Sequence, residues 1–241
     1  MNSNGFDKGD PRREEFPMIG PDGMTVDRQG RLIITTFSGR SIVRLEPDGT
    51  RTTIADRYEG KQLNGTNDVV VARDGAIYFT DTFGGLRLRD KDPRKELPYN
   101  AVFRWKAGSL TLLVSDMANT NGLAFSPDEK YLYANSGRDN YVRRYRVRPD
   151  GTLGEWTMFV DFRGATERGV TDGMKVDVRG NLYVTGPGGI WILDPGGKHL
   201  GTIRFPERPI NMAFGGTDRR TLYVTAHTAL YQVKVKIPGA T

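Results

Sequence analysis

Four oxygen-bearing side chains recur at one position of a repeated sequence pattern. They belong to Asp22, Asn67, Asn121 and Asp172. Carboxylate and amide oxygens suit hard divalent cations such as calcium, magnesium or manganese, and they can also bind zinc. Two carboxylates would balance the charge of such an ion. If the four segments bring these residues to one point, the pattern predicts a site for one divalent metal ion.

Composition excludes several other kinds of site. The sequence has no cysteine, which rules out disulfides, thiolate-bound zinc, iron–sulfur clusters and a thiol nucleophile. It has two histidines, His199 and His227, so a three-histidine metal site is impossible. No Gly-x-Ser-x-Gly elbow and no Walker-type phosphate loop occurs. These absences favour metal-assisted chemistry over an acyl-enzyme route.

A purely structural interpretation of the recurring residues competes with the metal site. Asp-Gly and Asn-Gly are common turn sequences, and each pair could simply make the turn into a strand. Asn67 is an exception, because Asp68 rather than a glycine follows it. The sequence leaves both interpretations open.

Five repeated segments predict the elements that must position these side chains. Each segment consists of three short runs rich in β-branched and aromatic residues, bounded by Gly, Pro, Asp and Asn, which is typical of strands and turns. The first runs are 21–27, 66–72, 120–126, 171–177 and 209–215; the second are 31–36, 76–81, 131–135, 181–185 and 221–225; the third are 41–45, 101–105, 141–145, 189–193 and 229–233. Asp-Gly pairs at 48–49, 74–75 and 150–151 predict hairpin turns. We expect helices only as short pieces in loops.

The spacing of the repeats predicts an all-β fold of the β-propeller class. The recurring positions 22, 67, 121, 172 and 210 lie 45, 54, 51 and 38 residues apart, and each interval has room for about four strands. Ile210 breaks the oxygen-bearing pattern. A long β-sandwich is the alternative fold, but it does not explain the repeated opening motif.

We predict five blades in a single propeller domain over residues 1–241, with a polar N-terminal tail at 1–11. The last repeat contains three strands, at 211–215, 221–226 and 229–236. Propellers usually close by pairing an N-terminal strand with the last blade. Residues 12–16, with a strand at Glu14–Phe16, are therefore predicted to complete the fifth blade.

The charge and hydropathy of the chain indicate its surroundings. It carries 35 basic and 29 acidic residues, a formal charge of +6, but no nucleic-acid-binding motif accompanies this excess. Arginines in 141–148 alternate with Val142, Tyr145 and Val147, which is typical of a strand with one solvated face. No apolar stretch is long enough to span a membrane, and the first 13 residues lack the apolar core of a signal peptide. We expect a cytoplasmic protein without nucleic-acid or membrane partners; a truncated N-terminus would also allow the periplasm.

Several motifs together resemble one known family. The segments are Leu63-Asn-Gly-Thr-Asn-Asp-Val-Val-Val, Asp74-Gly-Ala-Ile-Tyr-Phe-Thr-Asp, Asn121-Gly-Leu-Ala-Phe-Ser-Pro-Asp-Glu, Asp172-Gly-Met-Lys-Val-Asp, Gly180-Asn-Leu-Tyr-Val-Thr-Gly-Pro-Gly-Gly and Ala213-Phe-Gly-Gly. From about residue 20 to its C-terminus the chain resembles the gluconolactonase and senescence-marker-protein (regucalcin) lactonases. The resemblance implies a six-bladed propeller with one divalent metal ion in its channel. It also implies hydrolysis of sugar lactones such as gluconolactone.

The resemblance assigns roles to individual residues. It implies that Asn121 and Asp172 are metal ligands, that Asn67 binds water or substrate beside the metal, and that Asp172 is the general base. The family's first blade begins with a Glu-Gly-Pro segment whose glutamate binds the metal, and no such segment occurs here. We therefore expect this blade and one anionic ligand to be missing. Either Asp22 substitutes, as a carboxylate at the matching register, or the site is crippled.

These observations lead to two functional hypotheses. The first is a metal-dependent hydrolase of sugar lactones, in which the metal polarises the lactone carbonyl and Asp172 takes a proton from the attacking water. Its cofactor would be one divalent ion (Ca, Zn, Mg or Mn), and its partner a small-molecule lactone. The second is a propeller without catalysis that binds a cation or another partner. We expect a monomer or a weak homodimer in either case.

Overall fold

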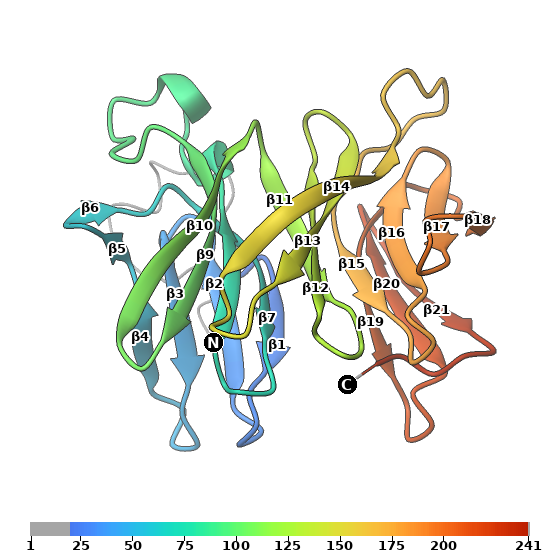
Figure 1. Cartoon of the computed structure of the whole chain (residues 1–241), viewed down its shortest axis with the longest axis horizontal. Helices are drawn as coiled ribbons and strands as arrows, with labels where there is room; N and C mark the ends of the chain where they lie inside the picture. Colours follow the sequence, from blue (N-terminus) through green and yellow to red (C-terminus); the bar gives the residue numbers. More distant parts are fainter. Residues whose placement is uncertain (1–19, 241) are drawn as a thin grey trace. The chain divides into compact units, whose positions relative to one another are not determined.

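The structure, a computed structural model, describes residues 20–240. These residues form five antiparallel sheets and one small hairpin, in which consecutive strands pair in chain order (Figure 1). The chain divides into two compact units, Met1–Thr120 and Asn121–Thr241. The single domain over residues 1–241 stays a prediction.

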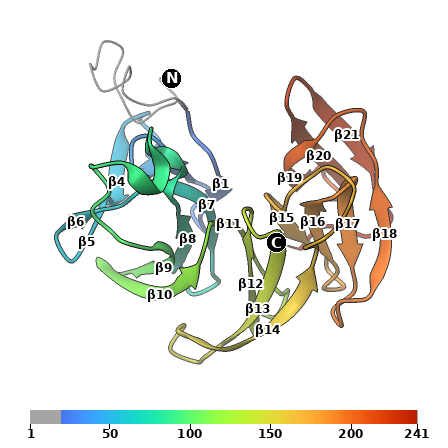
Figure 2. The ribbon, with the colours of Figure 1, turned by 90° about the horizontal axis from the view of Figure 1, so that it is seen from above.

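The first unit contains two four-stranded blades. Blade 1 consists of β1 (Met24–Val26), β2 (Leu32–Thr36), β3 (Ser41–Leu45) and β4 (Arg51–Ala55), and blade 2 of β7 (Thr66–Val71), β8 (Ile77–Asp81), β9 (Asn100–Lys106) and β10 (Ser109–Met117). The hairpin β5 (Arg57–Tyr58) and β6 (Lys61–Gln62) lies between the blades in sequence. Two 3₁₀ turns, Phe83–Gly85 and Arg89–Lys91, lie in the loop between β8 and β9. Figure 2 shows β1 and β7, the first strands of the two blades, side by side.

The second unit contains two four-stranded blades and one three-stranded blade. Blade 3 consists of β11 (Thr120–Phe125), β12 (Tyr131–Ser136), β13 (Tyr141–Val147) and β14 (Leu153–Asp161), and blade 4 of β15 (Met174–Val176), β16 (Leu182–Gly186), β17 (Gly189–Leu193) and β18 (His199–Ile203). Blade 5 consists of β19 (Pro209–Gly215), β20 (Thr221–Ala226) and β21 (Leu230–Lys234). The predicted closing strand at Glu14–Phe16 lies outside the described residues.

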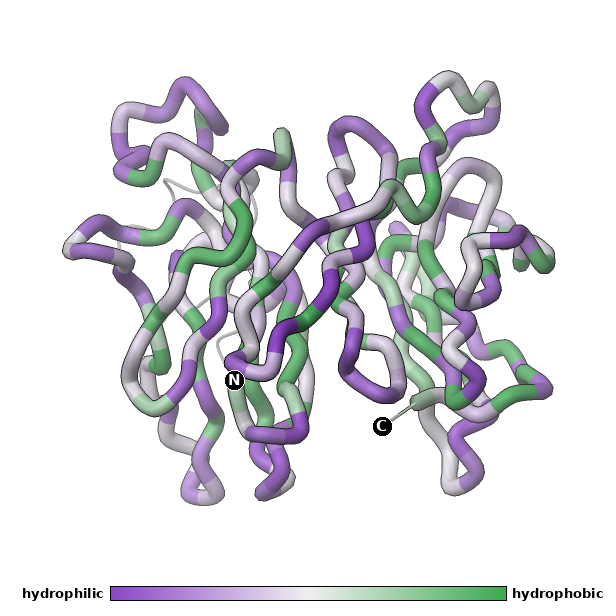
Figure 3. The backbone as a smooth tube through the Cα atoms, in the orientation of Figure 1, coloured by the Kyte–Doolittle hydropathy of each residue, from purple (hydrophilic) through white to green (hydrophobic). Residues whose placement is uncertain are grey.

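These sheets confirm the predicted all-β propeller with five blades. Each predicted run contains a strand, and the sandwich alternative is wrong because every sheet is a separate meander of sequential strands. Hydrophobic residues concentrate in the strands and hydrophilic residues in the turns (Figure 3). Among the described residues, no helix is long and apolar enough to cross a membrane.

The cores of both units form where successive blades pack face to face. In the first unit, Ile33 and Ile42 of blade 1 pack with Val69, Phe79 and Phe103 of blade 2. The second unit has one core between blades 3 and 4 and another between blades 4 and 5. The central strands β8 and β16 are buried along their whole length.

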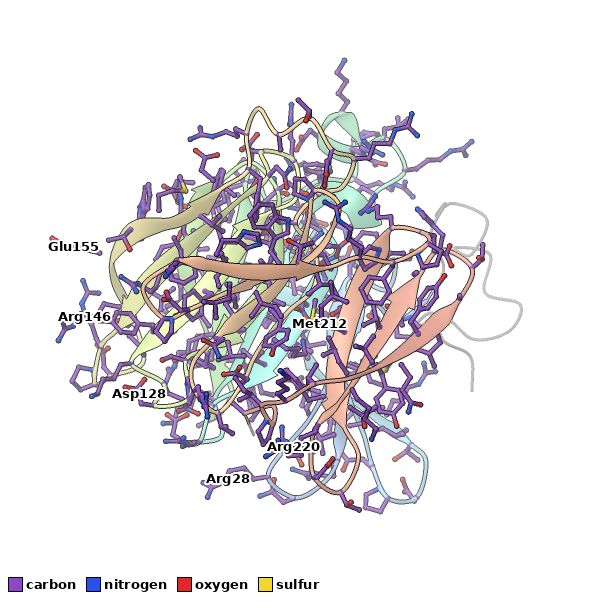
Figure 4. The ribbon with its side chains drawn as sticks, turned by 90° about the vertical axis from the view of Figure 1, so that its right-hand side faces the viewer. Arg28, Asp128, Arg146, Glu155, Met212 and Arg220 are labelled. Carbon is purple, nitrogen blue, oxygen red and sulfur yellow. The ribbon has the colours of Figure 1, made fainter. Side chains whose placement is uncertain are left out.

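The side chains of the second unit follow the same division between core and solvent. Met212 of β19 is 4% exposed and lies inside the unit, whereas Arg146 and Glu155 point outward from β13 and β14 (Figure 4). Arg143 departs from the solvated strand face that the sequence predicted. It is 9% exposed, and its guanidinium lies 3.9 Å from the centre of the Trp156 ring. Cation–π stacking therefore covers part of the arginine-rich strand.

The predicted Asp-Gly hairpins form as their chemistry requires. Gly49, Gly75 and Gly151 have φ values of 84°, 81° and 81°, which side chains with a Cβ rarely adopt. The aspartate before each glycine accepts an N–H from the residue two positions further on, as Asp74 does from Ala76 at 2.9 Å. These local bonds fix the turns between neighbouring strands.

Candidate functional site

The structure places the recurring residues at the start of the first strand of every blade. Asp22 and Asp172 lie two residues before β1 and β15, and Asn67 and Asn121 are the second residues of β7 and β11. Ile210 is the second residue of β19. The shared register predicted from the sequence is therefore real.

The glycines that follow these residues serve close backbone packing. A Cβ added to Gly23 would lie 2.7 Å from the carbonyl oxygen of Asn67, and one added to Gly122 would lie 2.1 Å from that of Asp172. Within blades 4 and 5, a Cβ on Gly173 would lie 2.0 Å from Oδ1 of Asn211. None of these glycines has a positive φ. The turn interpretation is wrong for them: glycine is needed because the next blade's first strand comes too close for a side chain.

A second repeated position ties the first strands together. Thr35 Oγ1 donates to the carbonyl oxygen of Asn67 at 2.6 Å, and Thr185 Oγ1 accepts the backbone N–H of Asp172 at 2.8 Å. In blade 3 the corresponding residue is Asn135, whose Nδ2 donates to the carbonyl oxygen of Asp172 at 2.6 Å. The backbone of Asp172 is therefore held from two sides.

In the first unit, Asp22 and Asn67 form a direct side-chain pair. Asn67 Nδ2 donates to Asp22 Oδ2 at 2.6 Å. Asn67 is buried, with 7% of its surface exposed. Since the amide nitrogen faces the carboxylate, the amide oxygen Oδ1 is turned away from it and can serve a different partner.

The loop that leads into Asn67 is fixed by a buried carboxylate. Asp81, at the end of β8, accepts the backbone N–H groups of Asn64 at 2.9 Å and Gly65 at 2.7 Å. Burial raises the pKa of the Asp81 carboxyl to about 6, although the two backbone N–H groups and the Arg40 charge act in the opposite direction. Sequence reasoning missed this residue. The sequence could have pointed to it, because Asp81 is a carboxylate at the end of the second strand of blade 2. The other four blades have uncharged residues there, namely Thr36, Ser136, Gly186 and Ala226.

In the second unit, Asn121 on β11 lies beside the segment that leads from Asp172 into β15. The close approach of Gly122 to the Asp172 backbone places the two residues' main chains together. The carboxylate of Asp172 is 17% exposed and forms an ion pair with Arg208, with Nη2 3.3 Å from Oδ2. The Arg208 side chain is 39% exposed.

Arg208 is the second site residue that sequence reasoning missed. It stands just before β19, two residues ahead of Ile210. Ile210 could have drawn attention to this part of the chain, because it leaves blade 5 without an oxygen-bearing residue at the shared position. Arg208, in the loop before blade 5, instead contacts Asp172, which holds the shared position in blade 4.

The structure thus brings the four predicted residues together in two pairs, one in each unit. Asp22 contacts Asn67, and Asn121 neighbours Asp172. Within residues 20–240, no three carboxylate or imidazole groups form a cluster. A divalent cation would therefore need amide oxygens as well as carboxylates, and this mixed oxygen set fits a hard cation such as calcium.

Comparison with known proteins places this architecture in a family. The sequence profile of the SMP-30/gluconolactonase/LRE-like region matches residues 50–228. The chain belongs to this family. The matched range covers parts of all five blades and includes Asn67, Asn121 and Asp172.

Individual relatives agree with the family assignment. The chain is 35% identical to a gluconolactonase of Zymomonas mobilis over 234 residues, covering 93% of this chain and 66% of the relative. It is 28% identical to the pentonolactonase XacC of Haloferax volcanii, covering 84% of this chain and 66% of that protein. The chain thus spans just under two thirds of the length of these relatives.

Solved structures agree with the propeller fold. A gluconolactonase from Xanthomonas campestris superposes with a TM-score of 0.79 at 32% identity, covering 91% of this chain and 72% of that one. A calcium-binding protein, regucalcin, from Agrobacterium tumefaciens superposes with a TM-score of 0.65, covering 93% of both chains. At 20% identity, the regucalcin likeness shows the fold alone.

Proposed function

We propose that this protein hydrolyses sugar lactones with the help of one divalent cation. The observation that carries the proposal is Asp172, a partly exposed carboxylate that neighbours Asn121 at a shared blade register. The family relationship supports it, since relatives at 35% and 32% identity are named gluconolactonases. The class of substrate is therefore a small cyclic ester of a sugar acid.

Asp172 is proposed as the general base. Its carboxylate accepts a proton from a water molecule whose oxygen attacks the lactone carbonyl carbon. The bond between that carbon and the ring oxygen then breaks, and the ring oxygen leaves as a hydroxyl group after taking up the proton that Asp172 accepted. The product is the open-chain sugar acid. Thr185 and Asn135 hold the backbone of Asp172, so the base is fixed in position before substrate arrives.

Asn121 and Asp172 are the residues that we propose to hold the cation, and Asp22 remains a proposed further ligand. Calcium, magnesium, manganese and zinc are all compatible with such oxygen ligands. A bound cation supplies polarisation of the lactone carbonyl and stabilises the negative charge that develops on its oxygen. Asn67 is proposed to bind substrate or water through its amide oxygen, because its amide nitrogen already faces Asp22.

The test is turnover of gluconolactone, measured above its spontaneous hydrolysis. We expect a chelator to abolish the enzymatic rate and return of a divalent metal to restore it. Asp172→Asn should remove most of the activity. Asp161→Asn is the matched control, because Asp161 also pairs with an arginine in the second unit, Arg163, but at an exposed position outside the site. A rate that ignores the chelator, or a fully active Asp172→Asn, would reject the proposal.

The Arg208 ion pair favours a second candidate function, a propeller that binds a cation or partner without catalysis. The guanidinium lies 3.3 Å from Oδ2, one of the two oxygens that would have to accept the proton in catalysis. Stoichiometric cation binding to purified protein with no lactone turnover would support this second function and contradict the first.

A further inference from the structure

Arg208 occupies a position that conflicts with the proposed role of Asp172. Its Nη2 lies 3.3 Å from Oδ2 of Asp172, the carboxylate that we assign to the cation. The pair spans 36 residues of sequence and joins two neighbouring blades of the second unit. The Arg208 guanidinium and a divalent cation from solution would therefore share the single carboxylate of Asp172.

The backbone on either side of this ion pair is independently fixed. Pro209 restricts the backbone of Arg208 to extended conformations, and the Ile210 carbonyl accepts the N–H of Gly173 at 2.9 Å. Asp172 is held through Thr185 and Asn135. The two residues thus meet because their strands are anchored, and the ion pair is not what anchors them.

The side chain of Arg208 has no second polar partner within residues 20–240. Among the described residues, its ion pair with Asp172 is its one polar interaction, although a guanidinium carries five N–H donors. The nearby Arg204 pairs instead with Glu167, at 3.0 Å. Arg208 is therefore directed at the proposed cation ligand and at nothing else described.

We propose that Arg208 is a built-in counter-ion of Asp172 that competes with the divalent cation. In the cation-free protein, the guanidinium balances the charge of Asp172. A cation that binds Asp172 must either displace the guanidinium or bind beside its positive charge. This inference rests on the proposed function, since it takes Asp172 as a cation ligand.

Competition and a purely structural role predict opposite changes in cation affinity when the ion pair is lost. Loss of a structural ion pair would loosen the site and weaken cation binding. Loss of a competitor would tighten it, because two like charges a few ångströms apart repel even near a protein surface. We expect removal of the guanidinium to lower the dissociation constant of the cation about tenfold or more.

The experiment is calorimetric titration of the full chain with calcium and, separately, with manganese, at fixed ionic strength. Arg208→Gln and Arg208→Met remove the charge in two different shapes, and Arg208→Lys keeps it. Arg204→Gln is the matched control, because it breaks an arginine–carboxylate pair in the same loop without touching Asp172. We expect tighter binding in the two neutral variants, and affinity close to that of the wild type in Arg208→Lys and Arg204→Gln.

The outcomes separate this inference from the proposed function. Unchanged or weaker cation binding in whichever neutral variant folds, as judged by circular dichroism, overturns the competition. Asp172→Asn, titrated in parallel, should lose the cation. If Asp172→Asn binds the cation as well as the wild type does, the proposed cation site itself fails.

Discussion

The carboxylates Asp22 and Asp172 occupy the same register in different blades but have different partners. Asp22, in the first unit, accepts a hydrogen bond from the neutral amide of Asn67 at 2.6 Å. Asp172, in the second unit, pairs with the charged guanidinium of Arg208 at 3.3 Å. In both places a glycine lets the neighbouring backbone approach. The repeat therefore sets where the carboxylate stands, and the neighbouring side chain sets what it can do.

The difference has a chemical consequence. The amide of Asn67 brings no charge of its own to Asp22, which suits a carboxylate that binds a cation. The guanidinium of Arg208 balances the charge of Asp172, which suits a carboxylate that binds its cation reversibly. Four experiments test this difference between the two regions.

The largest expected effect is on catalysis. Asp172→Asn should lower kcat/KM for gluconolactone about 1,000-fold, because it removes both the proposed general base and a proposed charged ligand of the cation. Asp22→Asn should lower it only about 10- to 100-fold, because it removes a proposed further ligand and leaves the proposed base in place. Both would be measured in saturating metal. Equal losses in the two variants would show that the two carboxylates share one role.

The next largest effect is on stability, at the glycines of the two regions. Gly122→Ala should cost about 3 kcal/mol or more in the free energy of unfolding, and Gly23→Ala about 2 kcal/mol. The order follows from the space available, since the added Cβ would lie 2.1 Å from its nearest neighbour at Gly122 and 2.7 Å at Gly23.

Chemical denaturation measures both glycine variants. Gly201→Ala is the control, because Gly201 lies in β18 with nothing within 4 Å of an added Cβ and without a positive φ. The control should change stability by less than about 0.5 kcal/mol. A tolerated Gly122→Ala would contradict the close packing of the first strands.

A third, smaller effect is the pH dependence of stability in the first unit. The pKa of Asp81 is raised by burial to about 6 from an ordinary value of 3.8. The folded protein therefore binds this proton more tightly than the unfolded chain does, so the contribution to stability is full below pH 4 and is lost as pH rises through 6. From pH 7 to pH 5, the wild type should gain about 1 kcal/mol relative to Asp81→Asn.

Urea denaturation at both pH values measures the difference between the wild type and Asp81→Asn. Exposed Asp128→Asn is the control, since the pKa of Asp128 is lowered by its hydrogen bond from Ser126 and so predicts no gain on acidification. A constant difference between the wild type and Asp81→Asn would contradict the raised pKa.

The smallest effect is expected at Asn135, the one member of its repeat position that is not threonine. Its Oδ1 is buried without a hydrogen-bond partner, while its Nδ2 binds the Asp172 carbonyl. Asn135→Thr removes the unpaired acceptor and weakens the donated bond, so the two effects offset to within about 1 kcal/mol. Thermal unfolding measures it. Asn135→Val removes the donor as well and should cost more; the reverse order would show that the donated bond is unimportant.

The strands and the shared register were predictable from local chemistry. Alternating apolar residues and Asp-Gly turns act over a few residues, so the runs around Ile77 and Leu182 could be recognised as strands from the sequence. The repeat then gave Asp22, Asn67, Asn121 and Asp172 equivalent places. The reason for the glycines was misjudged in part, because the neighbour that excludes a Cβ at Gly122 is 50 residues away, at Asp172.

The blades, their number and the shared register of the oxygen-bearing positions could be predicted from the sequence, because each follows from a short-range pattern and its repetition. The contact of Arg208 with Asp172, and the bonds by which Asp81 holds the loop before Asn67, became known from the folded structure alone. Those contacts depend on how neighbouring strands and blades pack, and packing brings together residues whose separation in the chain carries no periodic signal. The chemistry of each carboxylate is set by such a neighbour.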